Sequence, residues 1–286
     1  MSTYTSFAVA GAGSIGAPVV NALLERNVKV LVLTRSSSGS KSFPEHANLT
    51  VAPVEYTNRE ATSALLREHG VEVVVSTLTF ANKGAKETQT LLADVSKEAD
   101  VKLFVPSEFG LPTEGATEGF PAEKSQFAAY LKSIGIPSLR LYTGLFQEYI
   151  PWTGAVPETG KFHIVGKGNT PVSFTSIPDI AGYLAHVLTT LPPSQLADVQ
   201  LRIEGERLTL NEVARLYGDK VPAVHVDSIT VPNSEIRNYL QGIFESGPGS
   251  SGWDLRSGKD DADLARSGNA LWKGHEWSTV KQVLAL

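Results

Sequence analysis

The sequence predicts an α/β protein with a doubly wound parallel sheet and a smaller, interwoven C-terminal lobe. Three observations favour this fold class. Short apolar runs alternate with amphipathic helical segments, a glycine-rich turn follows the first run at once, and the alternation ends near residue 150. Successive parallel strands need crossover connections, which the helical segments supply. We expect the chain to divide into residues 1–151 and residues 152–286.

The first part alternates between runs rich in β-branched residues and helical segments. The predicted strands cover 7–10, 28–33, 49–54, 72–77, 102–105 and 138–142, and the helices cover 17–26, 58–68, 86–99 and a segment from about residue 122. Pro53 cannot donate to a β ladder, so the third strand should lie at an edge of the sheet. Parallel sheets bind ligands beyond the carboxyl ends of their strands, so the loops that begin there are the candidate site.

The second part has shorter elements. We expect strands at 161–166, 172–175 and 200–203, the last returning to the main sheet, and helices at 180–189, 210–217 and 235–244. Asp179 should cap the helix that begins at Ile180. The segment 245–259 is rich in glycine and serine, which predicts a mobile loop. His163 has no obvious acidic partner and is interpreted as structural.

A glycine motif joins the first predicted strand to the first predicted helix. Gly11-Ala12-Gly13-Ser14-Ile15-Gly16 has the spacing G-x-G-x-x-G in a strand–turn–helix context. Gly11 permits the tight turn, Gly13 lets a pyrophosphate approach the backbone, and Gly16 lets the helix lie close to the strand. The helix N-terminus then offers N–H groups to phosphate oxygens. The motif, Ser14 and Ile15 included, predicts a dinucleotide site.

The end of the second strand favours NADPH over NADH. An acidic residue there would bind the ribose hydroxyls, but this chain has Thr34-Arg35-Ser36. Arg35 can pair bidentately with a 2′-phosphate, and Ser36 adds a hydroxyl donor. Lys41 would add a second positive charge. An ordinary solvated arginine in a serine-rich loop is the alternative.

Composition excludes several classes of protein. The net charge is −5, so no basic surface for nucleic acid is expected. The chain has no cysteine, which excludes disulfides and thiolate chemistry, and its six histidines lack metal-binding spacing. It shows neither a secretory signal nor an apolar run near the roughly 18 residues that span a bilayer. We expect a cytoplasmic protein with a small-molecule substrate and no membrane or metal, as a monomer or homodimer.

A long loop follows the fifth strand and ends at the helix that contains Lys124. Loops longer than about 12 residues are often functional. We expect Lys124 in the first helical turn, where the helix dipole disfavours its charged form, and burial there would suit it to proton transfer. An ordinary surface lysine is the alternative. No lysine follows a tyrosine at the spacing Tyr-x-x-x-Lys, since Phe120 holds that place before Lys124.

Several segments together resemble the NmrA-like, isoflavone reductase-like branch of atypical short-chain dehydrogenases. They are the glycine motif, Arg35, Gln89-x-Leu91-Leu92, Val101–Gly110 with its Pro-Ser-Glu-Phe-Gly block, Lys124, Gly135-Ile136-Pro137 and Pro178-Asp179-Ile180-Ala181. The resemblance implies a Rossmann sheet that binds NADPH. It also implies that Lys124 is the catalytic acid/base beside the cofactor.

The resemblance and the strand ends together give a list of expected site residues. Thr77 and Ser107 follow the fourth and fifth strands and should contact the cofactor, as should Lys124. Phe109, Phe146 and Tyr149 should face an apolar substrate, although such aromatic residues are more often core.

The expected activity is reduction of a C=C, imine or carbonyl bond in a small, largely apolar molecule. Two alternatives stay open: a non-catalytic dinucleotide sensor of the NmrA type, and a redox-neutral cyclase or isomerase that uses the cofactor structurally.

Overall fold

The computed structural model describes residues 3–35, 43, 45–79 and 84–286. The chain forms two compact units, each assembled from three segments. The first unit comprises Met1–Glu108, Gly115–Arg140 and Ala181–Gln200, and the second comprises Phe109–Glu114, Leu141–Ile180 and Leu201–Leu286. The boundary expected between residues 151 and 152 stays a prediction.

The first unit contains a five-stranded parallel sheet, which confirms the predicted fold class. Its strands are β1 (Ser6–Ala10), β2 (Lys29–Arg35), β3 (Leu49–Val54), β4 (Val73–Ser76) and β5 (Leu103–Val105), in the spatial order β3-β2-β1-β4-β5. The strand that contains Pro53 lies at the edge, as its missing N–H requires. The order reverses between β1 and β4, which places the switch point beside the glycine motif.

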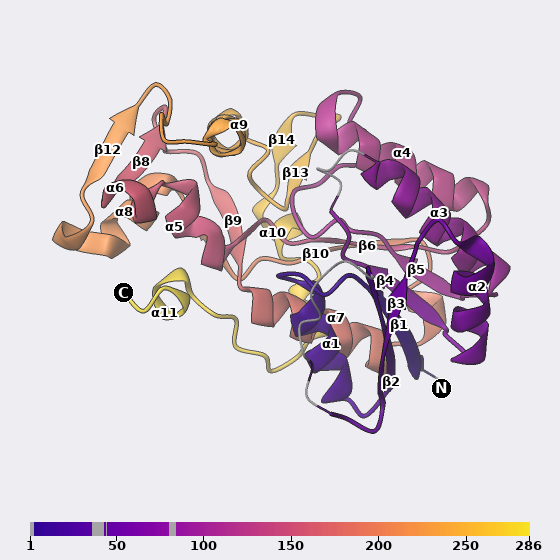
Figure 1. Cartoon of the computed structure of the whole chain (residues 1–286). Helices are drawn as coiled ribbons and strands as arrows, with labels where there is room; N and C mark the ends of the chain where they lie inside the picture. The colour runs from indigo at the N-terminus through magenta and orange to yellow at the C-terminus, as the bar shows by residue number, and fades with distance from the viewer. Residues whose placement is uncertain (1–2, 36–42, 44, 80–83) are drawn as a thin grey trace. The chain divides into compact units, whose positions relative to one another are not determined.

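Helices cover both faces of this sheet. The helices are α1 (Gly16–Leu24), α2 (Arg59–Glu68), α3 (Ala85–Glu98), α4 (Gly119–Ser133) and the second half of α7 (Ile177–Thr190). Figure 1 shows α2, α3 and α4 on one face and α1 on the other. Alternate strand residues such as Ala8, Leu31 and Phe104 pack with Leu66, Leu92 and Leu131 of α2, α3 and α4 in one buried cluster. Burial of this apolar surface holds the layers together.

The sixth predicted strand is joined to the sheet more loosely than expected. Ser138, which directly precedes β6 (Leu139–Tyr142), forms an isolated parallel bridge with Phe104 of β5. The ladder partner of β6 is β10 (Val199–Arg202), where Val199 N–H donates to Ser138 O at 3.1 Å. The strand expected to return to the main sheet therefore pairs with β6 instead.

The second unit is built from short elements around its own core. They are β7 (Leu145–Phe146), α5 (Ile150–Thr153), α6 (Val156–Thr159), β8 (Phe162–Val165), β9 (Val172–Thr175), β11 (Glu206–Leu208), α8 (Leu210–Tyr217), β12 (Ala223–Val226), α9 (Glu235–Ser246), β13 (Trp253–Asp254), β14 (Lys259–Asp260), α10 (Ala262–Ala265) and α11 (Val280–Val283). Buried apolar side chains, including Phe162, Phe174, Val213 and Phe244, form the core. α8 begins at a capping box of Thr209 and Glu212.

The middle of the segment 245–259, which was predicted to be mobile, instead packs against β9. Ser250 and Ser251 are fully buried, and Ser173 N–H donates to Gly249 O at 3.0 Å. A Cβ at Gly252 would overlap the carbonyl group of Asp261. Here glycine and serine allow close packing rather than motion.

The expected cap of α7 is also wrong, because the helix begins three residues earlier, at Ile177. Ser176 Oγ accepts the N–H of Asp179 at 3.1 Å and is the capping group. The Asp179 carboxylate accepts Ser278 N–H at 2.9 Å and lies 2.8 Å from His275 Nε2. His163 contacts Gly154 O and Thr159 Oγ1, which fits its structural interpretation.

Candidate functional site

The glycine loop leaves β1 in a conformation that requires its first glycine. Gly11 has φ +96°, a region that L side chains rarely adopt, and its N–H donates to Leu33 O at 3.0 Å. Thr77 follows β4 and donates from Oγ1 to Ala10 O at 3.0 Å and Gly11 O at 3.1 Å. Thr77 thus holds the loop in place. Whether it also contacts a cofactor stays a prediction.

Gly16 is required by packing, as predicted from the motif. A Cβ there would overlap Gly11 O and press against Thr77 Oγ1, so α1 could not lie this close to the end of β1. Gly16 is therefore explained by atoms of the chain itself.

Gly13 differs from both, because no described residue comes within 4 Å of the position that its Cβ would take. Its φ also lies outside the positive region. The adjacent N-terminus of α1 has no side-chain cap and no acidic residue in its first turn, so its N–H groups and positive dipole end are suited to an anion. An uncrowded loop backbone beside such a helix end fits the pyrophosphate of a dinucleotide.

Arg35 ends β2 and is exposed. The neighbouring Tyr56 donates from its hydroxyl to Leu33 O at 3.0 Å. Burial raises the pKa of Tyr56, and the charge of Arg35 opposes that rise. Arg35 therefore lies at the carboxyl end of β2, with its charge acting on Tyr56. Ser36 and Lys41, expected to assist it, lie outside the described residues.

Lys124 lies beside the segment that leaves β5. Its Nζ donates to the backbone carbonyl of Glu108 at 2.7 Å and lies 4.0 Å from Glu108 Oε2. The side chain is 12% exposed, and its Nζ also lies 5.2 Å from the centre of the Phe120 ring. Lys124 is thus a largely buried, positioned lysine rather than a solvated one.

The expected place of Lys124 in the first helical turn needs correction. α4 begins at Gly119, so Lys124 is in the second helical turn, beyond the strongest dipole field. Burial lowers the pKa of Lys124, the nearby Arg140 lowers it further, and Glu108 opposes both.

Arg140 is a site neighbour that sequence reasoning missed. It lies on β6, is buried, and donates from Nε to Glu108 Oε1 at 2.9 Å. The sequence did give a sign of its importance, because Arg140 is a charged residue inside the otherwise apolar strand Leu139–Tyr142. Ser107 is half-buried beside Glu108, and a cofactor contact for it stays a prediction.

Gln89 of α3 fixes the loop after β4. Its Oε1 accepts Ser76 Oγ at 2.7 Å, and its Nε2 donates to Leu78 O at 3.0 Å. Both ends of this fully buried amide are therefore used to hold a site loop.

The expected substrate residues belong to the second unit. Phe109 is buried with φ +32°. Phe146 is half-buried and lies 5.5 Å, ring centre to ring centre, from Tyr149, which is 37% exposed. Tyr149 in turn lies 6.4 Å from Trp152. Phe146, Tyr149 and Trp152 thus form one aromatic row, and its contact with a substrate stays a prediction.

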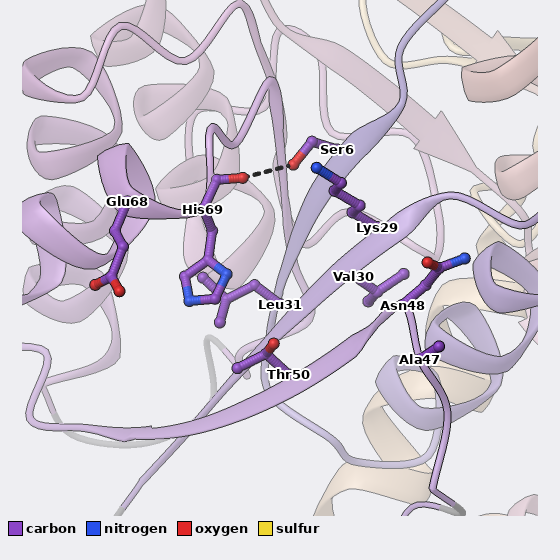
Figure 2. Close-up of a pocket in the computed structure, with 9 residues that line it drawn as sticks. All are labelled: Ser6, Lys29, Val30, Leu31, Ala47, Asn48, Thr50, Glu68 and His69. Carbon is purple, nitrogen blue, oxygen red and sulfur yellow. Dashed lines mark hydrogen bonds between the residues drawn. The ribbon is translucent and has the colours of Figure 1, made fainter.

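A separate pocket lies at the amino ends of the parallel strands, opposite the candidate site. Figure 2 shows Ser6 and Lys29, the first residues of β1 and β2, together with Glu68 and His69 at the end of α2. Ser6 Oγ donates to His69 O at 3.1 Å. Since ligands of such sheets bind at the carboxyl ends of the strands, this pocket is not the candidate site.

No group of histidine and acidic side chains that could hold a metal ion occurs among the described residues. Within the same residues, no helix is long and apolar enough to cross a membrane.

Comparison with known proteins identifies the family. The sequence model described as the NmrA-like family matches residues 5–246. The chain belongs to the NmrA-like family. This NmrA-like protein is 26% identical over 248 residues to phenylcoumaran benzylic ether reductase TP7 of Nicotiana tabacum, covering 82% of this chain and 79% of the relative. It is 26% identical over 246 residues to an isoflavone reductase of Pisum sativum, covering 77% of each.

A solved structure supports the same fold. The structure described as AtPrR2 with NADP⁺ and (+)-pinoresinol matches this NmrA-like chain with a TM-score of 0.79 at 19% identity, covering 99% of both chains. The family expected from the glycine motif and the Pro-Ser-Glu-Phe-Gly block is confirmed.

Proposed function

We propose that this NmrA-like protein is an NADPH-dependent reductase of a C=C, imine or carbonyl bond in a small, largely apolar molecule. Lys124, or a water that it orients, supplies the proton. The observation that carries the proposal is the buried Lys124, held by Glu108 O at 2.7 Å next to the carboxyl end of β5. The relatives named as reductases and the neighbour bound to NADP⁺ support the reaction class.

The residues present fit NADPH. Gly13 leaves its loop uncrowded, and the N-terminus of α1, with Ser14 and Ile15 before it, offers N–H groups to the pyrophosphate. Arg35 at the end of β2 would bind the 2′-phosphate through its guanidinium. When bound, NADPH supplies the hydride. Thr77, Ser107 and Lys124 are proposed to line the cofactor.

Lys124 suits proton transfer because its charged form is disfavoured. Its lowered pKa makes the ammonium a readier acid than an exposed lysine. Its bond to the Glu108 carbonyl fixes the direction from which the proton is delivered. Phe109, Phe146 and Tyr149 are proposed to contact the apolar body of the substrate, since aromatic faces pack well against flat apolar molecules.

The test is NADPH oxidation against a panel of enones, imines and quinones, with Lys124→Ala beside the wild type. Lys124→Ala should lower turnover by roughly 10²–10⁴ and keep NADPH affinity within about threefold, because one general acid is lost while the cofactor's main contacts remain. Lys132→Ala, an exposed position near the end of the same helix, is the matched control and should change neither.

Three results would contradict the proposal. Wild-type turnover in Lys124→Ala would mean that another group supplies the proton. NADPH binding without oxidation across the panel would favour the sensor. A product formed without net consumption of NADPH would favour the redox-neutral enzyme.

A further inference from the structure

Three charged side chains of the first unit are buried in one connected row. Glu108 is 2% exposed, Arg140 9% and Lys124 12%. Arg140 Nε donates to Glu108 Oε1 at 2.9 Å, and Lys124 Nζ lies 4.0 Å from Glu108 Oε2. Burial of a charge is costly unless it is paired, and here two buried cations lie close to the same buried carboxylate.

The two cations share that carboxylate unequally. Arg140 is directly hydrogen-bonded to Glu108 Oε1, whereas Lys124 lies 4.0 Å from Oε2. When Lys124 releases its proton, the Glu108–Arg140 ion pair keeps its hydrogen bond, so the buried carboxylate still has a cation beside it.

The row without Arg140 would behave in the opposite way. Lys124 would then be the cation beside Glu108, and loss of the lysine proton would remove that charge from beside the buried carboxylate. Such a pair holds its proton tightly, because an opposite charge nearby favours the charged form.

We propose that Glu108 and Arg140 are positioning residues for Lys124. The Glu108 carbonyl orients the Lys124 ammonium group by accepting its hydrogen bond. The Arg140 guanidinium pairs with the Glu108 carboxylate, so that Lys124 can release and regain its proton. This inference rests on the proposed function, since it assigns the proton-donor role to Lys124. It goes further in assigning tasks to two residues that act through Lys124.

Glu108 and Arg140 both act on the pKa of Lys124, Glu108 raising it and Arg140 lowering it. On α3, which packs against α4, Lys86 Nζ donates to Gln126 Oε1, and Asp94 is bonded to Tyr130. The remaining charged groups of α4 itself are Glu123 and Lys132, both exposed. The titration of Lys124 should therefore respond chiefly to changes at positions 108 and 140.

The experiment is a titration of Lys124 by NMR on protein carrying carbon-13 at the lysine Cε atoms. The Lys124 signal is assigned by its loss in Lys124→Arg, and no substrate is needed. Glu108→Gln should lower the titration midpoint of Lys124 and Arg140→Met should raise it, each by about one pH unit or more, because they remove opposite charges. Arg140→Lys keeps the charge and should stay within about half a pH unit of the wild type.

Arg59→Met is the matched control. It also removes one positive charge from the first unit, but Arg59 pairs on the surface with Asp94 and Glu98, so the Lys124 midpoint should not move. Circular dichroism checks that each variant folds. If Arg140→Met does not fold, the Lys124 midpoint in Glu108→Gln alone decides, since this variant keeps the backbone carbonyl and the side-chain volume.

Opposite shifts support the inference. Unchanged midpoints, or two shifts of the same sign, overturn it. A merely structural role of Glu108 and Arg140 would leave the Lys124 midpoint unchanged or shift it in the same direction in both variants. With a substrate in hand, the pH profile of kcat should shift in the same directions as the midpoints. If the midpoints shift but Lys124→Ala turns over normally, the proposed function fails while the control of Lys124 by its two neighbours stands.

Discussion

Gly13 and Gly16 are three residues apart in one motif, yet different constraints require them. Gly16 is demanded by atoms of the chain, because a Cβ would overlap Gly11 O. Gly13 has open space where its Cβ would lie. A glycine that the fold itself does not require points to something outside the chain, and the motif context makes that a dinucleotide.

This difference gives a prediction with a built-in control. Gly13→Val should leave the thermal stability nearly unchanged but lower NADPH affinity at least about tenfold, since its branched side chain occupies the space of the pyrophosphate. Gly16→Ala should instead destabilise the protein by about 1–3 kcal/mol through overpacking. Calorimetric binding and thermal unfolding separate the two effects. Normal NADPH affinity in Gly13→Val would mean that the phosphates do not lie on this loop.

At the same scale, the sequence predicted single residues better than pairs. Gly11, Gly16 and Lys124 stand in recognisable local contexts, so their importance could be inferred from the residues beside them. The Glu108–Arg140 ion pair joins residues 32 positions apart. The sequence around either residue does not indicate its partner. The lowered pKa of Lys124 was expected from the helix dipole and from burial, and burial is its largest cause.

At the scale of elements, the parallel sheet was predictable because buried parallel strands are dense in β-branched residues, as in Val73–Ser76. The short strands β7, β11 and β12 were not predicted, because each depends on a partner distant in sequence. β13 and β14 pair with each other but are only two residues long. The segment 245–259 failed for a related reason. Its glycines suggested mobility, but contact with Val172, Phe244 and Asp261 explains Gly249 and Gly252.

Asp179 provides the prediction at this scale. Its buried carboxylate accepts Ser278 N–H and contacts His275, joining the start of α7 to a C-terminal segment outside the matched family residues. Asp179→Asn should lower the free energy of unfolding by about 1.5–3 kcal/mol, because its amide group places a donor where an acceptor is needed. Urea denaturation measures the loss. Asp263→Asn, at an exposed position with a surface ion pair, is the control and should be nearly neutral; an equal loss in both variants would contradict the argument.

At the scale of the whole molecule, the buried Lys124 lowers the stability of the folded protein. A lysine kept where its charged form is disfavoured makes the folded state less stable than an apolar residue of similar size would, at every pH where the unfolded chain holds that proton. Such a loss of stability is expected at sites where a group must change its charge during catalysis.

The pH dependence of this cost is testable with Lys124→Met. Burial lowers the pKa of folded Lys124 below the 10.5 of an ordinary lysine, so between the two values the unfolded chain holds more protons. The lysine's contribution to stability therefore rises with pH across that window and levels off above about 10.5. Melting temperatures measured from pH 7 to pH 10 should favour Lys124→Met most at pH 7 and progressively less at higher pH. A constant difference would mean that the Lys124 pKa is not lowered.

The interleaving of the two units has a consequence for how the protein is made. The ribosome releases the chain from its N-terminus, and all five strands of the parallel sheet are synthesised by residue 105. The last segment of that unit, Ala181–Gln200, follows the whole of Leu141–Ile180, which belongs to the other unit. It carries His186, whose Nδ1 lies 3.3 Å from Arg26 Nη2 of the chain that follows α1. A nascent chain that ends before residue 181 thus holds a complete sheet inside an incomplete unit.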